Sequence, residues 1–184
     1  MRPPDRDRHD GGDSVPRLWV MLRDMTGGGS SIPEVQRLLA VLAAGRRVAE
    51  AGTAFGEGAE AMARTARSVV TVELDPERAA LAAERLGPYE NVELIVGDWR
   101  EQLPPRGPFG LVFLDGGGFK HAPEESGDLV FHLLEPGGLL VMDDLTPDWH
   151  GFDPVRAWAH GHPGLKAVEV LTTRETSALL IARI

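Results

Sequence analysis

Hydrophobic positions follow two alternating patterns along most of the chain. From Arg47 onward, short runs of aliphatic and β-branched residues alternate with longer stretches in which Ala or Leu recurs every three or four positions. The short runs predict buried parallel strands, and the periodic stretches predict the helices between them. The predicted strands cover residues 48–51, 68–74, 92–96, 111–115 and 139–143, and the predicted helices cover residues 57–67, 76–86, 124–134 and 154–160.

Both ends of the chain add elements to this core. Residues 1–15 are rich in Pro, Gly and charge and predict a flexible tail, whereas residues 17–25 have the apolar spacing of a short helix. A second helix is predicted from Pro33 to its end at Gly45. At the C-terminus, residues 165–171 and 178–184 predict a β-hairpin. We therefore expect one doubly wound α/β domain over residues 16–184, with N-terminal helices over 16–45 and the sheet core over 46–184.

Composition and charge narrow the classes of protein. The 184 residues include no cysteine and carry a net charge of −9. Without cysteine there is no disulfide, no thiolate metal site and no cysteine nucleophile. Basic residues scattered through an acidic chain argue against a nucleic-acid partner. No apolar run approaches the roughly 20 residues of a membrane-spanning helix, and the charged N-terminus does not read as a secretory signal. We therefore expect a cytoplasmic protein with no membrane partner.

The carboxyl ends of the first three predicted strands carry residues suited to a nucleoside, and ligands bind at this edge of a doubly wound sheet. The first strand leads into a glycine-rich turn at Gly52, where the backbone can approach a ligand closely. Glu73 follows Gly52 by 21 residues, the spacing at which a carboxylate accepts the hydroxyls of a ribose. Asp98 and Trp99 offer an acid for an adenine amino group beside a flat ring. Each feature alone is also explained as a turn, a helix cap or core packing, but together they predict a nucleoside cofactor.

A nicotinamide-dependent dehydrogenase is the main alternative, because the glycine spacing over residues 52–58 also fits short-chain dehydrogenases. Those enzymes need a tyrosine followed four residues later by a lysine. The only tyrosine here is Tyr89, and Glu93 occupies the fourth position after it. Glu50 would also place a carboxylate near the pyrophosphate of a dinucleotide, where charge repulsion is unfavourable. S-adenosylmethionine carries a sulfonium and an amino group instead, so it tolerates the same acid.

Five segments of the sequence resemble motifs of class I S-adenosylmethionine-dependent methyltransferases, nearest to the catechol-type and caffeoyl-CoA-type O-methyltransferases. Residues 47–56 (RVAEAGTAFG) resemble the first motif of that family, residues 71–80 (TVELDPERAA) its ribose-binding motif and residues 96–98 (VGD) its adenine motif. Residues 107–115 (GPFGLVFLD) and 134–144 (LEPGGLLVMDD) resemble its fourth and fifth strands. The resemblance implies a seven-stranded, mostly parallel Rossmann-like sheet with an antiparallel C-terminal hairpin.

The same resemblance implies a binding site for S-adenosylmethionine at the strand ends. The implied cofactor-binding residues are Glu50, Gly52, Thr53, Gly56, Gly58, Glu73, Leu74, Gly97, Asp98, Trp99 and Asp115. Gly58 is a departure, because the family commonly has a serine there, near the methionine carboxylate. Family members are often dimers, so a homodimer is the assembly that the resemblance suggests.

A metal site is also implied. In metal-dependent members of the family, acids that end the fourth and fifth strands hold Mg²⁺ or another hard divalent cation. The matching residues are Asp115, Asp143 and Asp144, and Asp144 replaces the asparagine of the family. Three converging carboxylates repel one another unless a cation or protons neutralise them, and oxygen ligands suit such a cation. The other interpretation of Asp143 and Asp144 is a turn-forming pair.

The resemblance also suggests a catalytic base, because related enzymes use a lysine that follows the fourth strand. Lys120 takes that place, with Asp115 as the second catalytic candidate. The segment between these two residues is longer than the usual spacing of the family, and His121 is a competing base. The other interpretation of Lys120 is a solvated surface side chain.

We therefore predict methyl transfer from S-adenosylmethionine to an oxygen of a small-molecule acceptor, assisted by a divalent cation. The alternatives are a metal-independent N- or O-methyltransferase with structural aspartates, and a nucleoside-binding module without turnover. The sequence does not identify the acceptor. Trp149, His150 and Trp158 follow the fifth strand and either wall the acceptor pocket or serve as core or dimer contacts.

Overall fold

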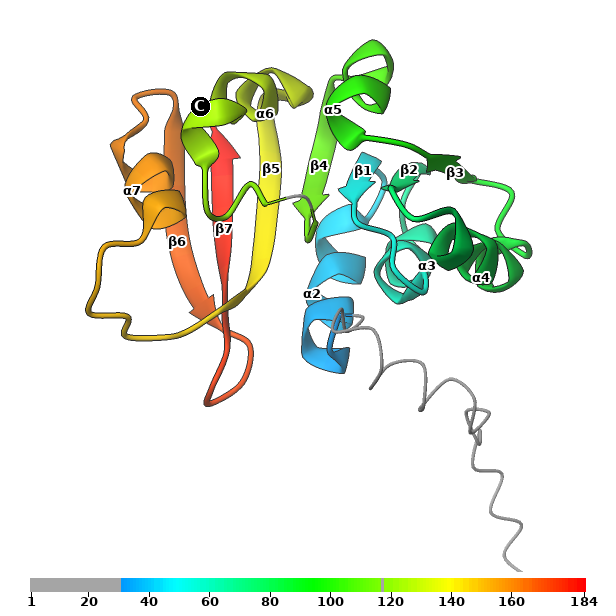
Figure 1. Cartoon of the computed structure of the whole chain (residues 1–184), viewed down its shortest axis with the longest axis horizontal. Helices are drawn as coiled ribbons and strands as arrows, with labels where there is room; N and C mark the ends of the chain where they lie inside the picture. Colours follow the sequence, from blue (N-terminus) through cyan, green and yellow to red (C-terminus); the bar gives the residue numbers. More distant parts are fainter. Residues whose placement is uncertain (1–30, 117) are drawn as a thin grey trace, which may run out of the picture.

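The computed structural model describes residues 31–116 and 118–184, which form a seven-stranded sheet in the order β3-β2-β1-β4-β5-β7-β6 (Figure 1). The strands from β3 to β5 pair in parallel, and β7 runs antiparallel to both β5 and β6. This confirms the doubly wound sheet with an antiparallel C-terminal hairpin. The strands are β1 (Arg47–Ala51), β2 (Ser68–Glu73), β3 (Val92–Val96), β4 (Phe109–Leu114), β5 (Leu134–Leu145), β6 (Leu165–Leu171) and β7 (Ser177–Arg183).

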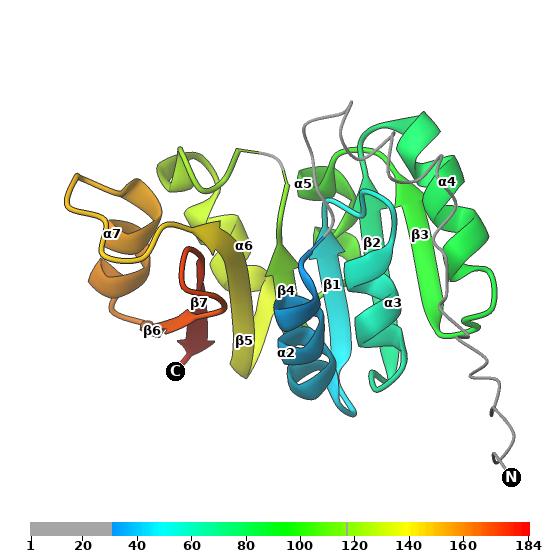
Figure 2. The same cartoon turned by 90° about the horizontal axis from the view of Figure 1, so that it is seen from below.

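Helices cover both faces of the sheet (Figure 2). Successive side chains of a strand point to opposite faces. On β4, Val112 and Leu114 therefore join the buried cluster under α5, α6 and α7, whereas Leu111 and Phe113 join the cluster under α2, α3 and α4. Burial on both faces explains why β4 reads as a continuous apolar run. The α-helices are α2 (Pro33–Ala43), α3 (Glu57–Ala63), α4 (Pro76–Leu86), α5 (Trp99–Gln102), α6 (Gly127–Leu133) and α7 (Pro154–Gly161).

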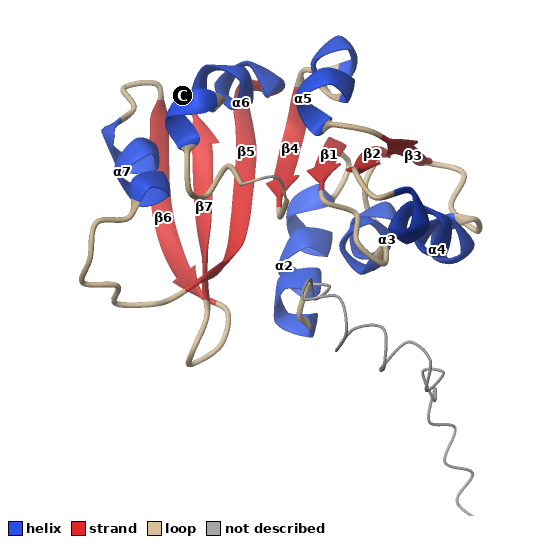
Figure 3. Ribbon diagram, viewed as in Figure 1, coloured by secondary structure: helices blue, strands red, loops and turns tan. Residues whose placement is uncertain are grey.

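Side-chain caps begin α4 and α5 at the carboxyl edge of the sheet. Asp75 accepts hydrogen bonds from the backbone N–H groups of Glu77 (2.8 Å) and Arg78 (3.4 Å), so α4 starts directly after β2. Asp98 likewise caps α5 by accepting from the N–H of Arg100 at 2.8 Å. In Figure 2 the arrowheads of β1, β2 and β3 point to the same edge, and Figure 3 distinguishes the helices (blue) from the strands (red).

Two predicted helices are shorter than expected. The predicted helix over residues 57–67 ends at Ala63, because the side-chain amide of Asn91 donates to the carbonyls of Ala63 (2.8 Å) and Ala66 (3.1 Å) and terminates it. The predicted helix over residues 124–134 begins at Gly127, after a short 3₁₀ turn over Pro123–Glu125.

Two further elements differ from the prediction. The strand expected from residue 139 already begins at Leu134, because Leu134 pairs with Phe109 at the start of β4. The short helix α5 was not predicted at all, since four residues carry too little periodicity to be recognised. Both differences arise from contacts or lengths that a sequence window does not register.

The predicted tail over residues 1–15 and the predicted helix over residues 17–25 lie outside the described residues. Within residues 31–116 and 118–184, no helix is long and apolar enough to cross a bilayer.

The buried face of α2 provides a test of the two-layer core. Leu39 is fully buried in the cluster under α2, α3 and α4, whereas Val41 on the same helix is exposed. We expect Leu39→Ala to lower the free energy of unfolding by about 2–5 kcal/mol, because it leaves a cavity in a packed core. Val41→Ala is the matched control and should change it by less than about 0.5 kcal/mol. Urea unfolding measures both, and equal losses would contradict the assigned packing.

Candidate functional site

A cavity of about 570 Å³ lies at the carboxyl ends of β1, β2, β3 and β4, and we call it the strand-end cavity. It brings together nine of the predicted site residues from segments that are far apart in the sequence. These are Gly52, Glu73, Leu74, Gly97, Asp98, Trp99, Asp115, Lys120 and Asp144. The volume is that of a typical small-molecule site.

The floor of the strand-end cavity is a close approach of two backbones. Gly52 has a φ of 94°, and a Cβ there would lie 2.9 Å from the backbone nitrogen of Gly116. The N–H groups of Asp115 and Gly116 both donate to the carbonyl of Ala51, at 3.0 and 2.9 Å. The ends of β1 and β4 are thereby held together, and only glycine fits at position 52.

Glu73 lines the cavity at the end of β2 and is nearly fully buried. Its Oε2 accepts a hydrogen bond from the N–H of Ala54 at 2.8 Å, and its Oε1 accepts from the N–H of Asp75 at 3.0 Å. Each carboxylate oxygen can accept a second hydrogen bond. Glu73 is therefore fixed by two backbone groups and keeps acceptor capacity toward the cavity.

The third strand end contributes an acid and an aromatic ring. Asp98 lines the cavity while it also caps α5. Trp99 is largely buried, and the guanidinium of Arg100 lies 4.8 Å from the centroid of its ring. Among the described residues, Trp99 Nε1 has no hydrogen-bond partner. The structural roles of Asp98 and Trp99 thus coexist with places on the cavity wall.

Two of the predicted cofactor residues belong to a buried polar chain beside the strand-end cavity and are not among its lining residues. The hydroxyls of Thr53 and Thr71 are 2.6 Å apart, and the Thr71 hydroxyl donates to Oε2 of Glu50. Burial raises the pKa of Glu50 to about 8, and the repulsion of Asp115 adds to this shift while the bond from Thr71 opposes it. Glu50 is therefore mainly a neutral acid at pH 7.

Gly56 and Gly58 have packing roles in the turn and are not among the cavity-lining residues either. Gly56 precedes α3 with a φ of 83°, and a Cβ there would lie 3.3 Å from side-chain atoms of Arg85 and Leu86 on α4. At Gly58, a Cβ would collide with Oε1 of Glu50. The Glu50 carboxyl fills the space that a larger residue at position 58 would need, which explains the departure from serine.

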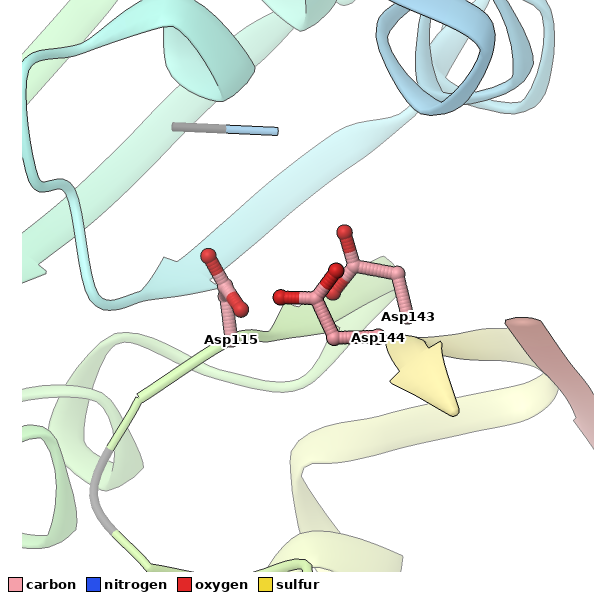
Figure 4. A group of neighbouring side chains, drawn as sticks. All are labelled: Asp115, Asp143 and Asp144. Carbon is pink, nitrogen blue, oxygen red and sulfur yellow. The ribbon is translucent and has the colours of Figure 1, made fainter. Parts of the chain in front are cut away.

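Three carboxylates converge at the ends of β4 and β5 (Figure 4). Asp115, Asp143 and Asp144 each offer an oxygen atom, and these oxygens all lie within 4.8 Å of one another. Asp144 has a φ of 56° where the pairing of β5 with β7 shifts register, and this irregularity lets adjacent residues face the same point. We call these residues the aspartate cluster.

Burial disfavours the ionised form of two carboxyls in the aspartate cluster, Asp115 and Asp143. Asp143 is 1% exposed, and burial followed by repulsion from Asp115 raises its pKa to about 7. Burial also raises the pKa of Asp115, and the nearby ammonium of Lys120 opposes that shift. Lys120 Nζ lies 3.6 Å from an oxygen of Asp115 and 3.6 Å from an oxygen of Asp143.

The donor set fits a hard cation. A divalent ion such as Mg²⁺ or Ca²⁺ takes oxygen ligands at about 2.0–2.6 Å, so oxygens within 4.8 Å of one another can share one ion. No described residue donates a hydrogen bond to Oδ1 of the buried Asp143. The residues present are therefore chemically suited to a divalent cation.

A second cavity, of about 270 Å³, adjoins the aspartate cluster, and we call it the loop cavity. Lys120, His121 and Asp144 line both the loop cavity and the strand-end cavity. Its outer wall includes Trp149 and Phe152, which are 56% and 83% exposed. Phe152 was missed by sequence reasoning, because no motif marks a single aromatic residue in a loop.

The loop that carries these aromatic residues is tied down at both ends by Arg156. Its guanidinium donates to the carbonyl of Thr146 at 2.7 Å and pairs with Asp153 and, at 2.6 Å, with Glu169 on β6. Residues 147–152 therefore project from a fixed base.

The other aromatic candidates have different positions. Trp158 packs edge-on against Phe119, with ring centroids 5.2 Å apart, and it also lines a third cavity of about 450 Å³ together with His121 and Phe152. His150 is exposed and lines none of these three cavities. Other lining residues of the strand-end cavity that sequence reasoning missed are Ala54, Val72, Arg78, Arg100, Gly116 and Gly118.

Comparison with known proteins gives a family match over the strand ends. A family model described as "Methyltransferase domain" matches residues 49–145. The protein-L-isoaspartate O-methyltransferase of Koribacter versatilis is 33% identical over 130 residues, which are 68% of this chain and 56% of that protein. The chain spans about half the length of the curated relatives it matches.

Two solved structures share the fold over most of the chain. Cofactor-bound Rv0187 from MTB has a TM-score of 0.69 and 26% identity, covering 95% of this chain and 92% of that chain. The O-methyltransferase TomG from Streptomyces achromogenes, involved in tomaymycin synthesis and solved in complex with SAM, has a TM-score of 0.64 and 26% identity. That match covers 88% of this chain and 83% of TomG.

The buried acid Glu50 provides a test of the electrostatics. Because its pKa rises from 4.5 to about 8 on folding, the folded protein binds more protons than the unfolded chain between these pH values. This contribution to stability is fully present below about pH 4.5 and is lost as pH rises toward 8. Glu50→Gln has no carboxyl at this position and loses this pH dependence. From pH 5 to pH 8, the unfolding free energy of the variant should therefore rise relative to that of the wild type by on the order of a few kcal/mol.

Urea unfolding at several pH values measures this difference. Glu84→Gln, on the exposed surface of α4, controls for the loss of a surface carboxylate. Parallel curves for the wild type and Glu50→Gln would contradict the buried, neutral acid.

Proposed function

Because the chain belongs to the family of methyltransferase domains, we propose that it transfers the methyl group of S-adenosylmethionine to a hydroxyl oxygen of a small molecule. The observation that carries this proposal is the junction of two cavities at the aspartate cluster. One cavity has the features of a nucleoside site, and the other has aromatic walls. A donor in the first would then face an acceptor in the second.

The donor assignment is supported by the residues at the three strand ends. We assign the ribose hydroxyls to Glu73, which retains acceptor capacity, and the adenine to the wall formed by Asp98 and Trp99. The close approach of the Gly52 and Gly116 backbones holds together two segments that both line the strand-end cavity. S-adenosylmethionine, when bound, supplies an already activated methyl group, so the protein mainly contributes positioning and the exclusion of water.

The acceptor assignment is supported by the composition of the loop cavity. Trp149 and Phe152 offer flat apolar surfaces, which suit a planar molecule of modest size. The polar end of the loop cavity holds Lys120, His121 and Asp144, where an acceptor hydroxyl would be oriented. The similarity to TomG favours an O-methyltransferase of this kind.

We further propose that Asp115, Asp143 and Asp144 hold a divalent cation beside the acceptor. Such a cation would supply Lewis-acid activation of the acceptor hydroxyl. His121, or Lys120 in its neutral amine form, would take up the proton that the hydroxyl loses, because both side chains border the two cavities. Without a cation, the cluster would orient the hydroxyl by accepting its hydrogen bond.

A protein acceptor is the second candidate, favoured by the similarity to the isoaspartate O-methyltransferase of Koribacter versatilis. An isoaspartyl side chain brings its own carboxylate. The exposed rings of Trp149 and Phe152 in the loop cavity suit a flat, neutral molecule better than that anion, so we rank a neutral hydroxyl first. RNA is disfavoured by the net charge of −9.

Binding of S-adenosylhomocysteine tests the donor site. We expect the wild type to bind it and Glu73→Gln to bind it about 1–3 kcal/mol more weakly, because one charged acceptor is lost. Glu77→Gln is the matched control, since Glu77 is exposed at the start of α4 and does not line the strand-end cavity. Calorimetric titration measures all three. Absence of binding by the wild type would reject the proposed function.

A screen with radiolabelled S-adenosylmethionine tests the acceptor and the cation. We expect methyl transfer to at least one catechol or phenol, and loss of transfer in EDTA with restoration by Mg²⁺, because the cluster then loses its activating ion. Full transfer in EDTA would favour the metal-independent alternative. Labelling of isoaspartyl peptides alone would favour the protein acceptor, and donor binding without transfer to either would favour a binding module.

A further inference from the structure

The ammonium of Lys120 lies beside two of the three carboxylates of the aspartate cluster. Its Nζ is 3.6 Å from Oδ1 of Asp115 and 3.6 Å from Oδ1 of Asp143. The Lys120 side chain is 20% exposed, and those of Asp115 and Asp143 are 15% and 1% exposed. This ammonium is thus a largely buried counter-ion, in contrast to a solvated surface lysine.

The local backbone fixes Lys120 in this position. On its N-terminal side, Phe119 is buried and packs edge-on against Trp158. On its C-terminal side, the N–H of His121 donates to the carbonyl of Gly118 at 3.0 Å and closes a turn. The buried ring of Phe119 and the turn closed at Gly118 therefore hold Lys120 beside the cluster.

Lys120 offsets part of the negative charge of the aspartate cluster in the absence of a metal. Three carboxylates held within a few ångströms need positive charge, and Lys120 supplies one unit of it. Oδ1 of the buried Asp143 accepts no hydrogen bond from any described residue, and the Lys120 ammonium lies 3.6 Å from it. A divalent ion bound to the same carboxylates and this ammonium would repel each other.

We propose that Lys120 is the built-in counter-ion of the aspartate cluster and that a divalent cation binds there only when the Lys120 ammonium is displaced from Asp115 and Asp143. This inference rests on the proposal that the cluster is a cation site. It assigns to Lys120 control over the cation affinity of the site, a role separate from proton transfer.

Titration with Mn²⁺ alone tests this competition, with the electron paramagnetic resonance signal of free Mn²⁺ as the readout. We expect Lys120→Met to bind Mn²⁺ at least about tenfold more tightly than the wild type, because the competing charge is gone. We also expect its melting temperature to be below that of the wild type without Mn²⁺, and Mn²⁺ to raise it further than it raises that of the wild type.

Two controls separate the local effect from general charge. The only other lysine in the sequence is Lys166, which is exposed on β6, so Lys166→Met makes the same change in net charge away from the cluster. It should retain wild-type Mn²⁺ affinity. Lys120→Arg keeps the charge and should also stay close to the wild type. Should Lys120→Met unfold, Lys120→Gln provides the same comparison.

The outcomes are decisive in both directions. Tighter binding confined to the uncharged Lys120 variants supports the inference. Equal affinity in Lys120→Met and the wild type, equal tightening in Lys166→Met or Lys120→Arg, or no Mn²⁺ binding by any variant overturns it. A different measurement, the titration with S-adenosylhomocysteine, would reject the proposed methyl transfer, so the two failures can be told apart.

Discussion

The contact between the backbones of Gly52 and Gly116 is the constraint on which the rest of the site depends. It holds the ends of β1 and β4 so close that a side chain at position 52 has no room. The turn after β1 is thereby fixed against the segment that carries Asp115, and Glu73 reaches the same turn through the N–H of Ala54. The strand-end cavity and the aspartate cluster thus lie at the same edge of the sheet and share Asp115 and Asp144.

Much of the fold and of the strand-end cavity was predictable because both follow from local patterns. Buried strands read as short apolar runs, and the carboxyl ends of parallel strands must meet at one edge. Gly52, Glu73 and Asp98 could therefore be placed together without coordinates. The end of α3 could not, because it is determined by Asn91, a residue far along the chain. The short helix α5 carries too few residues to show a period.

Side-chain detail was the other limit of the sequence. Gly58 looked like a member of the binding site, yet its lack of a side chain makes room for Glu50. The motif identified Lys120 as a candidate base, but only coordinates reveal that it faces two carboxylates. Phe152 became a candidate only because the structure places it on the wall of the loop cavity. In each case the decisive partner lies in another element, beyond the reach of spacing rules.

Arg156 holds Thr146 and Asp153, which flank the loop. A substitution within the loop therefore differs in its effect from a substitution at these anchors. Residues 147–152 can vary in length or composition while their anchors, and the sheet beneath them, keep their positions. The six residues of this loop can therefore be replaced, in evolution or by design, without altering the fold. The strand-end cavity, which lies at the same carboxyl edge but is lined by other segments of the chain, would remain intact.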